Sequence, residues 1–232
     1  MTAKFPNMQT SSSDGLRERK KAQVRADLER AALELALERD LDHVTVDEIC
    51  ARVPVSHRTF FNYFDTKEDA LFDVRRAWGD PEWIARRLAD AYEGSVVAAL
   101  VDTLFTASLP EEQDAEVREA RMLIAARHSG LLHRRPGRFD DLRSGLVSAV
   151  AAFLTDVGAA DEDAAADADA ADPVDAADTL DAAARAELLV VTCIAAIRIA
   201  VREWAEEGAG GAATRVADRA VAIARSIAPV VR

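Results

Sequence analysis

Apolar residues recur at helical spacing along most of the chain. The first such stretch runs from Leu16 to Arg39, and its apolar positions are Val24, Leu28, Ala31, Ala32 and Leu35. Further stretches with this period lie at about 95–108, 111–128, 139–157, 182–207 and 216–227. No segment shows the alternation of apolar and polar residues that marks a half-buried strand, so the pattern predicts an all-α protein.

A short second helix is predicted from its start and stop signals. Thr45 and Glu48 have the spacing of a capping box, in which each side chain bonds the backbone N–H of the other residue. The helix is expected to end near Arg52, because Pro54 fixes its own φ and disfavours helical geometry at the residue before it.

Two more helices are predicted directly after this one. Ser56 is a favourable N-cap for a third helix that continues to about Phe64. Thr66 opens an acidic variant of the capping pattern, which predicts a fourth helix from Lys67 to about Trp78.

The third helix has two different faces. Phe60 and Phe64 share one face, which we expect to anchor the helix against the first two. The other positions expose hydrogen-bonding side chains in a row: His57, Arg58, Thr59 and Asn62. Three helices, the second and third joined by a tight turn, form a helix-turn-helix, whose second helix enters the major groove of DNA.

The stretch "TVDEICARVPVSHRTFFNYFDTKEDAL" resembles the N-terminal DNA-binding domain of the TetR family of bacterial transcriptional regulators. The order of features matches this family from about Arg17 to Phe72. The resemblance implies a helix-turn-helix domain followed by a larger helical domain for ligand binding and dimerisation. It also implies a function in transcription and not in catalysis.

The resemblance assigns roles to individual side chains in DNA binding. Thr45 and Lys67 are expected to contact phosphates, and Tyr63 a phosphate or a base. The row on the third helix is expected to read bases: Arg58 can bond guanine O6 and N7, and Asn62 can bond adenine N6 and N7. The basic leader is expected to contact the DNA backbone or the minor groove through Arg17, Arg19, Lys20 and Lys21.

Two positions depart from the family's pattern. Pro54 stands where glycine is common, so the turn before the third helix requires different dihedral angles. Phe61 stands where many members have a tyrosine that bonds a phosphate. We expect Phe61 to pack against the sugar-phosphate wall instead.

The net charge of −12 argues against a nucleic-acid partner until its distribution is considered. Residues 1–67 hold 11 Lys and Arg and 11 Asp and Glu, so this part has no net charge. Residues 68–232 hold the other 18 Lys and Arg and 30 Asp and Glu, which account for the whole net charge of −12. The segment "RERKKAQVR" (residues 17–25) holds five cations and one anion. This asymmetry favours a polyanion that meets only the N-terminal end of the protein.

The composition also predicts the domain organisation. We expect a disordered arm over 1–15, a DNA-binding domain over 16–65 and a regulatory domain over 66–232. Residues 158–181 are rich in Ala and Asp, which predicts a flexible segment that cannot bury enough apolar area to offset its ordering entropy. A DNA-mimicking or partner-binding acidic tract is the alternative interpretation.

The regulatory domain contains candidates for a pocket that binds a small effector, as TetR relatives generally do. They are apolar or amphipathic residues, for which plain core packing is the alternative: Leu104, Phe105, Arg121, Met122, Phe153, Cys193, Ile197 and Trp204. The helix expected at 182–207 is apolar on nearly all sides between Leu188 and Val201, so it must be covered all round. Either the protein's own core covers it, or a second copy does, which favours a homodimer through the two C-terminal helices.

Other classes of function lack a signal in the sequence. We find no glycine-rich phosphate loop, nucleophile elbow or zinc-type cluster, and the spacing of His128 and His133 does not suit a metal pair. We therefore expect no enzyme, cofactor or metal; an enzyme whose catalytic groups converge from distant positions is the third alternative. Cys50 and Cys193 lie within apolar patterns and are expected to be small buried hydrophobic residues. The absence of a long apolar run and of a signal-peptide pattern predicts a cytoplasmic protein.

These features together predict a homodimeric repressor that binds a palindromic operator and is released by a small molecule. The alternative is a helical ligand-binding or scaffold protein whose N-terminal helices only pack. The exposed row on the third helix distinguishes the two, because only the first function requires it.

Overall fold

The computed structural model describes residues 11–72, 79–108, 115–128, 136–165, 180–209 and 213–227. Every element in these ranges is helical, which confirms the prediction of an all-α protein. The chain divides into two compact units, Met1–Leu71 and Phe72–Arg232. None of the described helices is long and apolar enough to cross a membrane.

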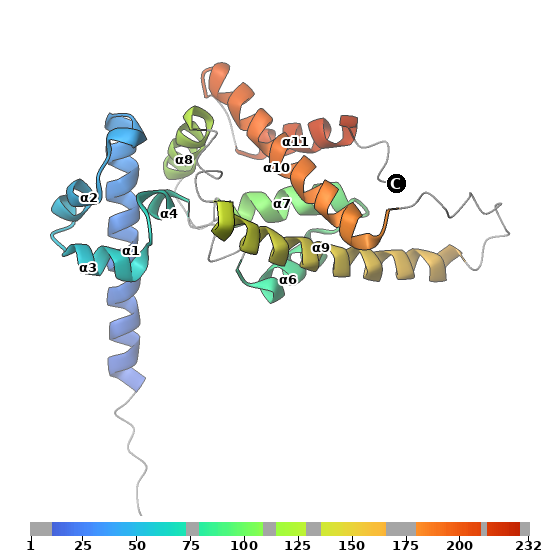
Figure 1. The fold of residues 1–232 in the computed structure, drawn as a ribbon, viewed down its shortest axis with the longest axis horizontal. Helices are drawn as coiled ribbons and strands as arrows, with labels where there is room; N and C mark the ends of the chain where they lie inside the picture. The colour runs from blue at the N-terminus through green and yellow to red at the C-terminus, as the bar shows by residue number, and fades with distance from the viewer. Residues whose placement is uncertain are drawn as a thin grey trace, which may run out of the picture. The chain divides into compact units, whose positions relative to one another are not determined.

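The first unit contains the predicted helix-turn-helix (Figure 1). Its elements are α1 Ser11–Glu38, the short 3₁₀ helix η1 Leu41–His43, α2 Val46–Arg52, α3 His57–Tyr63 and α4 Lys67–Leu71. Its buried core residues include Leu28 and Leu35 of α1, Ile49 of α2, Phe60 of α3 and Leu71 of α4. A few large side chains thus fill the interior of a small unit.

The second unit is a bundle of longer helices. They are α6 Pro81–Ala91, α7 Val96–Ser108, α8 Ala115–Arg127, α9 Pro136–Ala165, α10 Ala182–Glu206 and α11 Ala213–Ile227. Asp80 caps α6 and Asp181 caps α10, each by accepting a backbone N–H in the first turn. Helix α10 packs against α7, α8, α9 and α11, so the core of this unit forms around it.

Three predicted helix boundaries were wrong, one start and two ends. Helix α1 begins at Ser11, so residues 11–15 of the predicted disordered arm are helical, consistent with the preference of Ser and Asp for helix starts. Helix α9 continues to Ala165 instead of ending near residue 157. Alanine is the best helix former, so the first part of the acidic segment continues the helix. Helix α4 ends at Leu71 and Phe72 is not helical, so the predicted continuation of the fourth helix to about Trp78 was also wrong. Residues 73–78 and 166–179 lie outside the described residues.

Within this chain alone, helix α10 is covered on one side only. Leu188 and Val191 remain 52% and 49% exposed. The opposite side of α10 is buried, with Leu189, Val190 and Cys193 in the core.

Candidate nucleic-acid interface

The capping box at the start of α2 is present as predicted. The Thr45 hydroxyl oxygen accepts the Glu48 N–H at 3.3 Å, and Glu48 Oε2 accepts the Thr45 N–H at 3.0 Å. Glu48 also lies 2.8 Å from Arg39. The hydrogen bonds from Thr45, together with Arg39, hold the pKa of the Glu48 carboxyl below its usual range. The Thr45 side chain is exposed but already engaged in this cap.

The turn between α2 and α3 accommodates Pro54 without a left-handed residue. Val53 ends α2 with φ −114° and ψ 53°, and the Val55 N–H donates to the Cys50 carbonyl at 3.3 Å. Among the described residues, the non-glycine residue with positive φ is Ala209, which belongs to the second unit. The glycine that relatives commonly have here is therefore not required by this turn.

Ser56 caps α3 as predicted. Its hydroxyl oxygen accepts the Thr59 N–H at 3.1 Å, and the two hydroxyl groups of Ser56 and Thr59 lie 2.8 Å apart. Thr59 is half-buried and shares its hydroxyl with the cap. It is consequently less free than its neighbours to bond a base.

Helix α3 shows the two faces expected from its sequence. Phe60 and Phe64 are buried, with ring centroids 5.7 Å apart. Phe61 points outward and is 52% exposed, with its ring edge-on to Phe60. A large apolar ring thus lies on the exposed side of the helix, beside the hydrogen-bonding row.

The exposed row contains two side chains with free donors. Arg58 and Asn62 are exposed and form no side-chain hydrogen bond or ion pair within the part of the chain that the structure describes. His57 differs, because its Nε2 contacts the Asp47 carboxylate near the start of α2. Tyr63 is half-buried beside Phe64.

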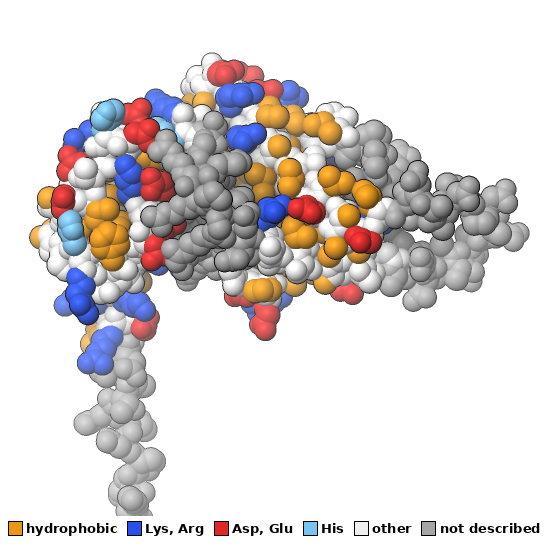
Figure 2. All heavy atoms as spheres, in the orientation of Figure 1, with side chains coloured by type: hydrophobic (Ala, Val, Ile, Leu, Met, Phe, Trp, Pro, Cys, Tyr) orange, Lys and Arg blue, Asp and Glu red, His pale blue; other side chains and the backbone are white. Residues whose placement is uncertain are grey.

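The basic leader is the first half of a long helix. Arg17, Arg19, Lys20 and Lys21 are all exposed on α1 and pair with no carboxylate in the described ranges. At roughly 100° per residue, Arg17 and Lys21 lie within about 20° of buried Leu28 around the helix axis and Lys20 about 80° away, whereas Arg19 lies on the opposite side. Figure 2 shows Lys and Arg side chains gathered where α1 extends beyond α3.

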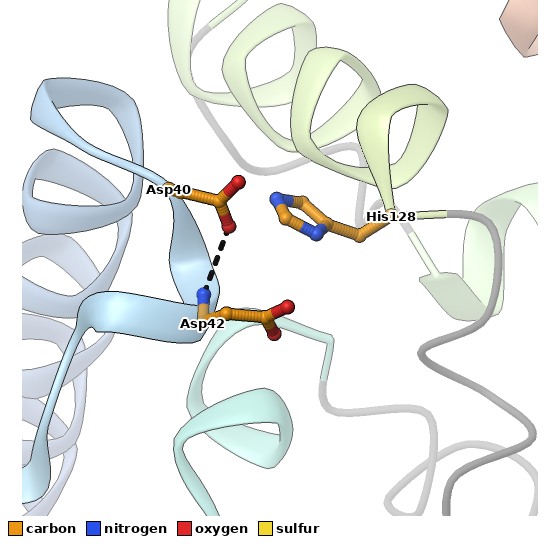
Figure 3. A group of neighbouring side chains, drawn as sticks. All are labelled: Asp40, Asp42 and His128. Atoms are coloured by element: carbon orange, nitrogen blue, oxygen red, sulfur yellow. Dashed lines mark hydrogen bonds between the residues drawn. The ribbon is translucent and has the colours of Figure 1, made fainter.

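Lys67 does not extend freely into solvent. Its Nζ donates to the carbonyl oxygens of Leu41 and Val44, both at 2.7 Å, and approaches that of Asp42 at 3.4 Å. These residues form the connection between α1 and α2. Asp40 caps the same connection by accepting the Asp42 N–H at 3.0 Å (Figure 3). The sequence carries no signal for the Lys67 contacts, because their acceptors are backbone atoms far away along the chain.

A second arrangement that the sequence did not reveal holds α2 against α1. The Arg52 guanidinium lies 3.2 Å from a Glu34 oxygen and 2.6 Å from a Glu38 oxygen. The hydrogen bond from Arg52 holds the pKa of the Glu38 carboxyl below its ordinary value. These contacts fix the orientation of α2, and through the short turn that of α3.

The predicted effector residues lie in or against the core of the second unit. Leu104, Met122, Cys193 and Trp204 are buried in it, while Phe105, Phe153 and Ile197 pack against it. Arg121 is also buried, with 3% of its surface exposed. Burial raises the pKa of the Cys193 thiol to about 12, which keeps it protonated. Of the two histidines considered for a metal, His128 follows α8 and His133 lies outside the described residues.

Comparisons with known proteins agree with this geometry. A family model described as "Bacterial regulatory proteins, tetR family" matches residues 29–74, which include the capping box and all of α2, α3 and α4. The HTH-type transcriptional regulator TcmR of Streptomyces glaucescens is 31% identical over 150 residues. That match covers 62% of this chain and 66% of TcmR, just under two thirds of its length.

Among solved structures, the chain was matched to the transcriptional regulator FadR from Bacillus subtilis in complex with stearoyl-CoA. It is 15% identical, with a TM-score of 0.48 over 89% of this chain and 99% of FadR. The specific evidence is the family match over the very helices that carry the capping box, the proline turn and the exposed row. Residues 29–74 therefore resemble, in sequence and in the order of their helices, the DNA-binding domain of bacterial regulatory proteins of the tetR family.

Proposed function

We propose that this protein is a transcriptional regulator of the TetR type: a cytoplasmic homodimeric repressor that binds a near-palindromic operator and is released by a small-molecule effector. The observation that carries the proposal is the pair Arg58 and Asn62, exposed on α3 without a partner among the described residues. Buried Phe60 and Phe64 hold the helix from behind, so both side chains are presented on a rigid support.

The chemistry of this pair suits direct reading of bases. A guanidinium bonds guanine O6 and N7 as a fork, and a carboxamide bonds adenine N6 and N7. His57 can add a contact, but its imidazole also meets Asp47, which limits its freedom. In a two-fold dimer, two such helices lie in successive major grooves about 34–36 Å apart, which corresponds to a near-palindromic site.

Dimerisation is supported by apolar side chains left exposed on the two C-terminal helices. Leu188 and Val191 lie one turn apart on α10, and Ile227 at the end of α11 is 63% exposed. Helices α10 and α11 pack closely against each other, so they present a common surface. A two-fold interface pairs such a surface with itself and covers its apolar residues.

Effector binding is supported by a buried donor in the second unit. Trp204 is 6% exposed, and its Nε1 is buried without a hydrogen-bond partner among the described residues. A buried donor without an acceptor is costly, so an acceptor atom of a ligand would stabilise it. The surrounding side chains are apolar, which suits a largely apolar effector that carries a carbonyl, hydroxyl or carboxylate oxygen.

The protein would be released from the operator if effector binding shifts α4. This helix ends the first unit, and the chain continues from it into the second. As a hypothesis, the effector favours a state in which the two reading helices no longer match the spacing of the operator. Equal operator affinity with and without a bound effector would refute this mechanism.

Selection of bound duplexes from a random DNA pool tests the central claim. At about 150 mM salt, non-specific phosphate binding is weakened, so enrichment of an inverted repeat is expected. The Arg58→Ala, Asn62→Ala double variant is expected to remain folded and to lose the sequence preference. Arg30→Ala serves as the matched control, because Arg30 is an exposed cation on the side of α1 away from Leu28. Unchanged selection by the double variant would favour a helical ligand-binding or scaffold protein.

A further inference from the structure

The ammonium of Lys67 is surrounded by three backbone carbonyl oxygens. Leu41 O and Val44 O lie at 2.7 Å from Nζ and Asp42 O at 3.4 Å. An ammonium has three N–H donors and no acceptor, so these three oxygens match its full hydrogen-bonding capacity. Lys67 is half-buried, whereas the cations of the basic leader are exposed. Its surroundings are therefore those of an internal contact.

We infer that Lys67 is a positioning residue for DNA binding, which clamps the α1–α2 connection to α4, and that it does not bind a phosphate. The inference rests on the proposed operator binding by this unit. The side chains of Leu41 and Val44 are anchored in the core, and Lys67 bonds the carbonyls of the same two residues. The connection is thus held both by its buried side chains and by its backbone carbonyls.

The clamp acts on the edge of the DNA-binding surface. Val44 immediately precedes Thr45, the N-cap of α2, so the direction of the Val44 carbonyl determines how the chain enters that helix. Lys67 opens α4, whose Ala70 and Leu71 are buried and which packs on α1. A displacement of α4 would therefore reach the start of α2 through one side chain, without passing through α3.

A phosphate contact would compete directly with this arrangement. To reach a phosphate, the ammonium would have to leave the two partly buried carbonyls at 2.7 Å. Removal of a partner from a buried acceptor is penalised, because such a group no longer reaches water. Arginine is not an equivalent clamp, since its planar fork does not converge on three oxygens as an ammonium does.

Two substitutions separate a clamp from a phosphate contact. Lys67→Met keeps the length of the stem and removes the charge, and Lys67→Arg keeps the charge and changes the geometry. Operator affinity of the full-length variants is measured over a salt series, at a temperature where circular dichroism shows each to be folded. The clamp predicts that both variants bind about tenfold more weakly, the scale of one missing hydrogen bond, with the salt slope unchanged.

A phosphate contact predicts a different pattern. Affinity falls as salt rises, so the slope of log affinity against log salt is negative. Lys67→Met alone would make this slope shallower by about 0.9 for each protomer, and Lys67→Arg would retain affinity. Lys20→Met is the matched control for removal of an exposed cation. A shallower slope for Lys67→Met would overturn the inference. Full affinity in both variants, with only the unfolding temperature reduced, would overturn it as well, because Lys67 would then be merely structural.

Amide hydrogen exchange tests the clamp without DNA. Residues 41–46 of free Lys67→Met protein are expected to exchange faster than in the wild type, while the amides of α3 keep their protection. Unchanged exchange over 41–46 would contradict the inference even if operator binding is established. If the wild type selects no DNA sequence, the proposed operator binding fails, and this exchange still decides whether the clamp exists.

Discussion

The Arg25 guanidinium of α1 lies over the ring of Phe64, with 4.7 Å between Cζ and the ring centroid. Phe64 is the C-cap of α3, so this cation–π contact joins the basic part of α1 to the end of the recognition helix. The contact helps to set the rotation of α1 about its axis. That rotation determines which of the exposed cations share the side of α1 that carries buried Leu28.

Removal of the three cations on this side should weaken DNA binding and flatten its salt dependence. The variant is Arg17→Ala combined with Lys20→Ala and Lys21→Ala, because these three residues lie on the same half of α1 as buried Leu28. Removal of one cation that binds a phosphate makes the slope of log affinity against log salt shallower by about 0.9. Operator titrations over a salt series measure the change.

Arg19→Ala is the control for these three substitutions. Arg19 lies on the opposite side of α1, so the salt slope is expected to stay as in the wild type. If Arg19→Ala makes the salt slope shallower by about 0.9, as expected for each of Arg17, Lys20 and Lys21, the orientation of α1 would be contradicted and an unstructured basic arm favoured.

Adjacent phenylalanines on α3 should respond in opposite ways to truncation. Phe60 is fully buried, so Phe60→Ala is expected to cost about 3–5 kcal/mol in the free energy of unfolding. Phe61 is 52% exposed, so Phe61→Ala is expected to cost less than about 1 kcal/mol and to reduce operator affinity instead. Urea unfolding and DNA titration measure the two effects. A Phe61→Ala variant with normal affinity would show that this ring does not pack against DNA.

The Glu38–Arg52 ion pair should make the first unit less stable in acid. The pKa of the Glu38 carboxyl is lowered from 4.5 in the folded protein, chiefly by the hydrogen bond from Arg52. The folded state thus binds this proton less tightly than the unfolded state does. The stabilisation is present above pH 4.5 and is lost as the pH falls through the folded pKa.

Urea unfolding at neutral and acid pH measures this contribution. Glu38→Gln is expected to lose less stability on acidification than the wild type, because it lacks the titrating group. Glu18→Gln is the control, since Glu18 is exposed and has no ion pair in the described part of the chain. If Glu38→Gln and the wild type lose the same stability, the pair contributes nothing measurable, as many exposed ion pairs do.

Charged residues on the exposed side of α10 should dissociate the dimer. Leu188→Asp with Val191→Asp places two carboxylates where we propose that a second copy packs, and unpaired buried charge is strongly unfavourable. Sedimentation is expected to show a monomer that has lost tight operator binding. Leu37→Asp is the control, because Leu37 is an exposed leucine of the first unit. A double variant that remains dimeric would place the interface elsewhere.

Local signals in the sequence predicted the helix-turn-helix well. The Thr45–Glu48 box and the Ser56 cap act within one helical turn, so their residue types and spacing suffice to start α2 and α3. The exposed and buried faces of α3 follow from helical geometry, which places Phe60 and Phe64 on one side. The end of α9 was misjudged, because low apolar content was given more weight than the helix propensity of alanine.

The sequence by itself determined the all-helical class, the caps of α2 and α3 and the family of the DNA-binding domain. Each of these depends on interactions between residues close together in the chain. Only the tertiary structure decided that Lys67 bonds the carbonyls of Leu41 and Val44, and that Arg52 spans Glu34 and Glu38. Such contacts join helices whose relative positions result from packing of the whole core, and no spacing between neighbouring residues encodes them.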